Sequence, residues 1–208
     1  MKIYIVRHGE TALNAEGVLQ GRLNEPLNQN GRELAEITGK AMKDIHFDYC
    51  ISSPLDRAKE TAEIILRESE NDISYTIDER IIEIGFDDME GKKIAERGDE
   101  GLKFFKDPFH FAGFSNGETI QDVCSRTQDF LKELIAKDDG KTYLISTHGC
   151  AMRGMVNYLS DDPEDYWLGH APYNCSFTII EAEGGKARIT DVDKVYYDPS
   201  LIVDHYKN

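Results

Sequence analysis

Short runs of consecutive apolar residues recur along the chain and predict β-strands. The run Ile3–Val6 stops abruptly at polar, glycine-rich sequence, and residues 142–147 are equally apolar. Two further short runs, at residues 47–52 and 74–78, follow the same pattern. Runs of this length bounded by turn-forming residues are typical of strands buried in a sheet.

Segments between these runs carry apolar residues at intervals of three and four, which predicts helices. The first begins near residues 28–30, with Leu34, Ile37, Ala41 and Ile45 at its apolar positions. The other predicted helices are residues 53–69, with Ser53 as N-cap and Pro54 at the first helical position, residues 119–137, with a cap near Thr119, and residues 149–159.

The alternation of strands and helices predicts an α/β fold, a three-layer α/β/α sandwich with a mostly parallel central sheet. The last two strands, at residues 175–183 and 186–195, flank a Gly-Gly pair typical of a hairpin. We expect residues 1–208 to form one domain. The irregular, glycine- and phenylalanine-rich stretch at about 85–117 is expected to cover the substrate, although its aromatic residues fit simple packing equally well.

Charge narrows the possible partners. The 208 residues include 24 Lys and Arg against 39 Asp and Glu, a net charge of −15. This balance argues against nucleic acid and anionic membranes as partners, because both require a positive surface. A small anionic ligand stays possible, since a few local arginines can override a diffuse negative field.

Neither a membrane-spanning run nor a secretory signal is apparent in the sequence, which predicts a cytoplasmic protein. The four cysteines are scattered without C-x-x-C spacing, which indicates buried thiols rather than a disulfide or zinc site. The cysteines are Cys50, Cys124, Cys150 and Cys175.

The sequence is compatible with a homodimer, but it does not specify the oligomeric state.

Polar residues follow three of the predicted strands directly. Residues 7–8 follow the first strand, residues 52–57 the second, and residues 147–149 the strand before the last helix. Because ligands bind beyond the C-terminal ends of parallel strands, these groups should meet at one edge of the sheet.

These groups supply two arginines, Arg7 and Arg57, and two histidines, His8 and His148. Arginine presents paired donors that match phosphate oxygens, and a neutral histidine can act as a nucleophile. The cluster therefore suits a phosphoryl group. Glu83, which follows the strand at 74–78, is placed to supply a proton to the leaving group.

Each of these residues alone is a weak indication. A single histidine at a strand end is more often a surface or hydrogen-bonded residue, and Cys150 fits the core better than it fits a nucleophile. Only the coincidence of His8, Arg57 and His148 after apolar strands favours a site. The remaining histidines are interpreted as ordinary surface or hydrogen-bonded residues: His46, His110, His170 and His205.

Five ordered motifs span nearly the whole chain, and together they resemble the histidine phosphatase superfamily, in its phosphoglycerate-mutase-like branch. They are RHGETALN at 7–14 followed by Gln20-Gly21, SSPLDRAKETA at 52–62, RIIEI at 80–84 with Glu83, NGET at 116–119, and STHGCAMRGMV at 146–156.

The resemblance implies a role for each matching residue. His8 would form a phosphohistidine, and Glu83 would act as general acid and then as base. Arg7, Arg57 and His148 would hold the phosphoryl oxygens. No metal or organic cofactor would be needed, and the partner would be a small phosphorylated metabolite. Further substrate contacts would come from Asn14, Gln20, Gly21 and Gly149.

The leading hypothesis is therefore a metal-independent phosphatase that hydrolyses a small phosphomonoester. One alternative is a phosphoglycerate mutase primed by bisphosphoglycerate, which needs extra cationic contacts. No basic run between residues 85 and 117 suits a second phosphate. Another alternative is a catalytically idle module that binds a phosphorylated ligand.

Overall fold

The computed structural model describes residues 1–93, 96 and 98–203, and His205 lies outside this part of the chain. A six-stranded sheet with the order β3-β2-β4-β1-β5-β6 forms its centre. The first four strands in this order are parallel, and β5 runs antiparallel to both of its neighbours, β1 and β6. The strands are β1 (Lys2–Arg7), β2 (Tyr49–Ser52), β3 (Tyr75–Ile77), β4 (Thr142–Thr147), β5 (Phe177–Glu183) and β6 (Lys186–Lys194).

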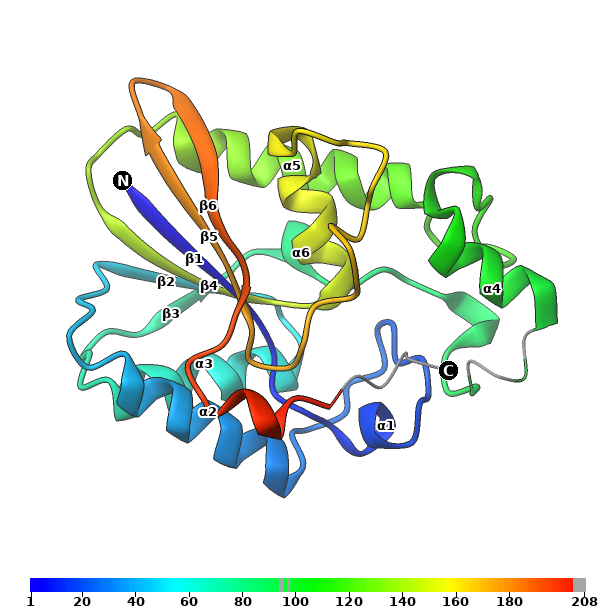
Figure 1. Cartoon of the computed structure of the whole chain (residues 1–208), viewed down its shortest axis with the longest axis horizontal. Helices are drawn as coiled ribbons and strands as arrows, with labels where there is room; N and C mark the ends of the chain where they lie inside the picture. The colour runs from blue at the N-terminus through cyan, green and yellow to red at the C-terminus, as the bar shows by residue number, and fades with distance from the viewer. Residues whose placement is uncertain (94–95, 97, 204–208) are drawn as a thin grey trace.

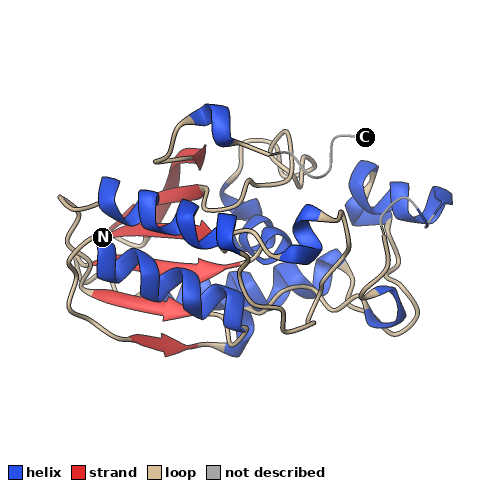
Figure 2. Ribbon diagram, turned by 90° about the horizontal axis from the view of Figure 1, so that it is seen from below, coloured by secondary structure: helices blue, strands red, loops and turns tan. Residues whose placement is uncertain are grey.

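Helices cover both faces of the sheet (Figures 1 and 2), which confirms the predicted three-layer α/β fold. One face carries α2 and α3, and the other carries α5 and α6. The helices are α1 (Ala12–Ala15), α2 (Gln29–Ala41), α3 (Asp56–Glu68), α4 (Gly98–Lys106), α5 (Ile120–Ile135) and α6 (Gly149–Val156).

The pleat of β1 shows why the sheet is buried on both sides. Ile3 and Ile5 pack in one cluster with α5 and α6, whereas Tyr4 and Val6 pack in another with α3. Successive side chains of a strand point to opposite faces, so a continuous apolar run can fill two cores at once. This explains why the run is not interrupted by alternating polar residues.

Some details of the predicted helices are wrong. Helix α3 begins at Asp56 with Leu55 as its N-cap, not at Pro54 with Ser53. The Ser53 hydroxyl lies instead 2.6 Å from Nε2 of His148, so a tertiary contact replaces the expected cap.

Helix α2 is shorter than predicted, and part of its expected inner face is exposed. It ends at Ala41, so Ile45 lies beyond it. Ile37 is 40% exposed, and Ala41 is exposed as well.

The segment 85–117 is more ordered than its sequence predicts. Its described residues form α4 and two short 3-10 helices, at Asp87–Met89 and Pro108–His110. In Figure 1, α4 lies at the end of the molecule opposite the strand N-termini. Three other 3-10 helices complete the described elements: Glu79–Ile81, Asn157–Leu159 and Pro199–Leu201.

The parallel strands end at the same level. Arg7 pairs with Thr147 across β1 and β4, and Ser52 pairs with Ser146 across β2 and β4. The residues that follow these strands therefore leave the sheet side by side, as the sequence predicts.

A close approach of two backbone segments fixes the turn after β1. A Cβ on Gly9 would lie 2.6 Å from the carbonyl oxygen of Gly31, and one on Gly31 would lie 2.2 Å from that of Glu10. The buried Glu10 carboxylate accepts hydrogen bonds from the side chains of Asn28 and Asn30 at the start of α2. Only glycine allows this contact, which locks the chain directly after His8 onto α2.

The sequence predicts buried cysteine thiols and no membrane-spanning segment. The four cysteines all lie in described positions, are buried, and form no disulfide there, as predicted. Across the described part of the chain, no helix has both the length and the apolar character needed to cross a membrane.

Candidate active site

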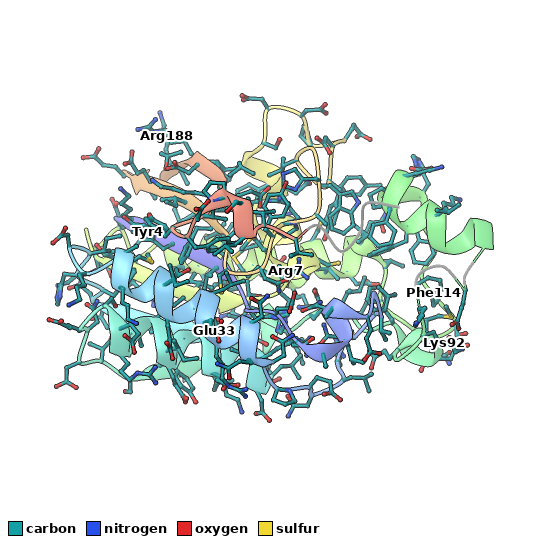
Figure 3. The ribbon with its side chains drawn as sticks, turned by 60° about the horizontal axis from the view of Figure 1, so that its bottom comes forward. Tyr4, Arg7, Glu33, Lys92, Phe114 and Arg188 are labelled. Carbon is teal, nitrogen blue, oxygen red and sulfur yellow. The ribbon has the colours of Figure 1, made fainter. Side chains whose placement is uncertain are left out.

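A cavity opens at the C-terminal ends of β1, β2 and β4, with about 470 Å³ of space between its walls including the open mouth. Figure 3 shows Arg7 in the centre of the molecule, whereas Phe114 and Lys92 lie at one end. The residues that line the cavity are Arg7, His8, Asn14, Leu19, Gln20, Gly21, Arg57, Glu83, Phe86, Phe104, Phe105, Gly149, Cys150, Trp167, Ala171 and Pro172.

His8 is held in one tautomer. Its Nδ1 lies 2.6 Å from the carbonyl oxygen of Gly9. Because a carbonyl can only accept, the ring proton is assigned to Nδ1. Nε2 then carries the lone pair, and it accepts a hydrogen bond from Nε of Arg57 at 3.2 Å. The nitrogen that could attack an electrophile is thus Nε2.

The surroundings of His8 keep its ring neutral. Burial is the largest cause and lowers the pKa of His8 well below 6.5, and the charges of Arg57 and Arg7 lower it further. The hydrogen bond to Gly9 acts in the opposite direction but is outweighed. A neutral imidazole retains the lone pair that a nucleophile needs.

Two buried arginines flank His8, and carbonyl oxygens orient both. Arg57 donates from Nη1 to Leu23 at 2.6 Å and from Nη2 to Gly21 at 2.7 Å. Arg7 donates from Nη1 to the carbonyl of Pro172. These carbonyl contacts fix the orientation of both guanidinium groups.

His148 lies beside His8, with ring centroids 5.2 Å apart, although it is fully buried and does not line the cavity. Its Nε2 contacts the Ser53 hydroxyl, while its Nδ1 has no hydrogen-bond partner among the residues that the structure describes. Burial first, and then the charges of Arg57 and other groups, lower the pKa of His148 well below 6.5. An unpaired buried ring nitrogen next to a nucleophile is the kind of group that a bound ligand satisfies.

Glu83 sits at the N-terminus of α6. Its Oε1 accepts from the backbone N–H of Ala151 at 3.1 Å, and its Oε2 accepts from that of Cys150 at 3.3 Å. A Cβ added to Gly149 would lie 3.8 Å from both Arg7 Nε and Glu83 Oε2. Gly149 therefore lies close to both the carboxylate of Glu83 and the guanidinium of Arg7.

A network behind Glu83 fixes its backbone. Arg126 donates from Nη1 to the carbonyls of Arg80 and Ile82, and from Nη2 to that of Glu83 at 3.2 Å. Its guanidinium also pairs with Glu118, with a closest contact of 2.9 Å. The NGET motif and the arginine that follows it thus hold the turn that presents the carboxylate.

The predicted substrate contacts fall into the same cavity. Asn14 and Gln20 both bond Thr11, which connects the two polar side chains to the short helix α1. Gly21 has a φ of +50°, and a Cβ there would lie 2.2 Å from Oε1 of Glu90. The structure thus gathers Arg7, His8, Asn14, Gln20, Gly21, Arg57, Glu83 and Gly149 along the cavity, with His148 behind it.

The sequence does not predict the place of Trp167 in the wall of the cavity. Trp167 follows the last helix in a stretch without periodicity, yet it stacks on Phe105 with centroids 5.8 Å apart. Cys150 also lines the cavity, but burial raises the pKa of its thiol well above the usual value, and Glu83 raises it further. Because the thiolate is the nucleophilic form, Cys150 is a poor nucleophile, as expected.

The other described histidines lie outside the cavity. His46 is exposed, and His110 is exposed beside Asp107. His170 lies 3.5 Å from the carboxylate of Asp193. These positions fit the ordinary surface or hydrogen-bonded role predicted for them.

Comparison with known proteins points to one family. Residues 3–194 match the family model of the histidine phosphatase superfamily (branch 1). The chain is 34% identical over 163 residues to the uncharacterized phosphatase PhoE of Bacillus subtilis, covering 78% of this chain and 79% of that protein. It is 31% identical over 192 residues to a 2,3-bisphosphoglycerate-dependent phosphoglycerate mutase of Thermoplasma acidophilum, covering 89% and 90%.

Among solved structures, Bacillus stearothermophilus YhfR aligns with a TM-score of 0.84 at 30% identity, covering 93% of this chain and 97% of that one. The predicted family is therefore confirmed, and the match includes all the site residues described above. The relatives include both a phosphatase and a mutase, so family membership alone leaves the reaction open.

The two neutral histidines predict a loss of stability in mild acid. As pH falls below about 6.5, the unfolded chain takes up protons on His8 and His148 before the folded protein does. Each histidine should then cost roughly one kcal/mol of unfolding free energy per pH unit. Urea unfolding at pH 7.5 and 5.5 measures this loss.

Replacing either histidine with glutamine should reduce the stability difference between the two pH values. A His46→Gln variant, which removes an exposed imidazole, should keep the wild-type difference. An unchanged difference in both His8→Gln and His148→Gln would show that the buried rings do not titrate in this way.

Proposed function

The chain belongs to the histidine phosphatase superfamily, and we propose that it hydrolyses a small phosphomonoester through a phosphohistidine at His8. The observation that carries the proposal is the state of His8: its Nδ1–H bonds the carbonyl of Gly9, and its Nε2 lone pair accepts a hydrogen bond from the buried Arg57 in a cavity that Arg7 also lines.

In the first half-reaction, Nε2 of His8 attacks phosphorus and the bond from phosphorus to the ester oxygen breaks. Arg7 and Arg57 stabilise the negative charge on the phosphoryl oxygens, and Nδ1–H of His148 donates a further hydrogen bond to them. The bond between Nδ1–H and the Gly9 carbonyl strengthens as the ring becomes positively charged. Nε of Arg57, which bonds Nε2 in the free enzyme, then turns its proton to a phosphoryl oxygen.

Glu83 handles the proton in both half-reactions. As a carboxylic acid it protonates the departing alkoxide, which leaves as an alcohol. As a carboxylate it then takes a proton from water, whose oxygen attacks phosphorus and releases His8. Its position in the same cavity as His8, fixed by the N–H groups at the start of α6, supports this role. These steps use only side chains of this protein, water and the substrate.

The mutase alternative is less well supported. It requires cationic groups for a second anionic centre, either the primer's other phosphate or the carboxylate of phosphoglycerate. Of the cavity-lining residues described, Arg7 and Arg57 supply the cations, and both flank His8. The idle-module alternative is disfavoured because mere binding of phosphate gives no reason for a nucleophile held in one tautomer.

A coupled assay separates phosphatase from mutase. With 3-phosphoglycerate as substrate, we expect release of inorganic phosphate and no gain in 2-phosphoglycerate when bisphosphoglycerate is added. Primer-dependent formation of 2-phosphoglycerate at a rate above phosphate release would favour the mutase.

We also propose, from the sequence and the family, that the protein is cytoplasmic, that its partner is a small phosphorylated metabolite and that it requires no cofactor. The phosphatase assays include a chelator, because loss of activity in its presence would contradict the metal-independent reaction.

Substitution of the nucleophile should remove turnover. His8→Ala lacks the attacking nitrogen, and we expect hydrolysis of p-nitrophenyl phosphate to fall by at least about 10⁴-fold. Circular dichroism should show an intact fold. His110→Ala, which removes an exposed histidine, should turn over the substrate like the wild type. Near-wild-type turnover in His8→Ala would reject the assignment.

Substitution of the acid should act selectively. Glu83→Gln cannot donate a proton, so kcat/KM for an alkyl phosphate, which reports the first half-reaction, should fall by about 10²- to 10³-fold. The value of kcat/KM for p-nitrophenyl phosphate should fall by less than about tenfold, because nitrophenolate leaves without protonation. Asp87→Asn, a change at an exposed acid of the same loop, serves as the control. Equal slowing of both substrates would remove Glu83 from the role of acid.

A further inference from the structure

The cavity has two chemically different sides. His8 and the two arginines form one side, and aromatic side chains form the other. Phe86, Phe104 and Phe105 come from the segment 85–117, and Trp167 comes from the loop after α6. We call these four residues the aromatic wall.

The aromatic wall is a built surface rather than a loose lining. Phe104 packs edge-on against Phe86 at 5.3 Å and against Trp167 at 5.6 Å, and Phe105 stacks on Trp167. Phe86 and Phe104 are almost completely buried. Rings held in this way keep their positions without a ligand, so little ordering entropy opposes binding against them.

We propose that the aromatic wall binds the leaving group of the substrate and selects phosphomonoesters of apolar alcohols, aromatic ones above all. The inference rests on the proposed function, because it takes the phosphoryl group to lie at His8. The ester oxygen then leaves toward Glu83, and the carbon skeleton attached to it extends into the rest of the same cavity.

The distribution of charged residues around the cavity favours a leaving group without a charge. The guanidinium groups of Arg7 and Arg57 already bond backbone carbonyls beside His8. Nearby Arg22 is paired with Glu118 at 2.9 Å. None of the four residues of the aromatic wall carries a charge, so a second phosphate or a carboxylate would lose water there without gaining a cation.

Two esters of simple primary alcohols test the wall directly. Ethyl phosphate and 2-phenylethyl phosphate have similar leaving groups, so they differ chiefly in a phenyl ring. Burial of roughly 100 Å² of apolar surface should raise kcat/KM for the phenylethyl ester by about 10- to 100-fold. Initial rates of phosphate release give this ratio for each variant.

Phe105→Ala should bring the ratio of the two kcat/KM values to within about threefold of one, because it opens the wall. The half-buried Phe109 provides a matched control. It packs in the same aromatic cluster, at 5.6 Å from Tyr166, but does not line the cavity. Phe109→Ala should therefore keep the wild-type ratio, and an equal fall in both variants would show a general effect on the fold and overturn the proposal.

The proposal and the proposed function can fail separately. Equal kcat/KM for the two esters in the wild type would overturn the wall as a selective subsite, while the phosphatase assignment would stand. Should the protein hydrolyse neither ester nor p-nitrophenyl phosphate, the proposed function fails. Calorimetry then measures the affinity for each of the two esters and tests whether the aromatic wall binds the phenyl ring. Tighter binding of the phenylethyl ester supports it, and equal affinity overturns it.

Discussion

The register between β1 and β4 sets the geometry of the site. Pairing of Arg7 with Thr147 makes the two strands end together, so His8 and His148 leave the sheet as neighbours. A slip of one residue would turn every side chain of β1 to the opposite face and would separate the two rings. The register is held in turn by the apolar residues that fill both cores. Apolar packing on the two faces of the sheet thus determines which polar side chains meet at the C-terminal ends of its strands.

The site then depends on how its charges are held. Arg7 and Arg57 are oriented by carbonyl oxygens, whereas Arg126, outside the cavity, is paired with the carboxylate of Glu118. Carbonyl oxygens are neutral acceptors, so these contacts fix the geometry of the two guanidinium groups without adding a negative charge. Burial first, and then the charges of the two arginines, keep His8 neutral, so one arrangement serves both binding and attack.

Local patterns in the sequence predict those parts of the structure that local interactions decide. Thr119 caps α5, as predicted, and α2 begins after its N-cap Asn28, within the predicted start near residues 28–30. Both starts are local, because an N-cap bonds a backbone N–H only a few residues away. Ser53 has the same chemistry, but its hydroxyl contacts His148, which is distant in sequence. The competition between a local cap and a tertiary contact cannot be judged from the residues around Ser53 alone. Ile37 was misplaced because helical periodicity does not indicate where a neighbouring helix stops covering α2.

The candidate site divides in the same way. Arg7, His8 and His148 were predictable because each directly follows an apolar strand whose end the sheet topology fixes. The partnership of Trp167 with Phe105 was not, since the two residues meet only through the packing of two irregular segments.

The two sides of the cavity are supported by different parts of the fold. The phosphoryl side of the cavity is built on strand ends, where a change in geometry would disturb both cores. The aromatic wall is carried by α4, by the loop that holds Trp167 and by Phe86 at the start of a 3-10 helix, and it touches the sheet only indirectly. Side chains there can change without moving His8 or the arginines. Relatives that share the phosphoryl side can therefore differ in the molecule attached to the phosphate, which fits a family whose members include both a phosphatase and a mutase.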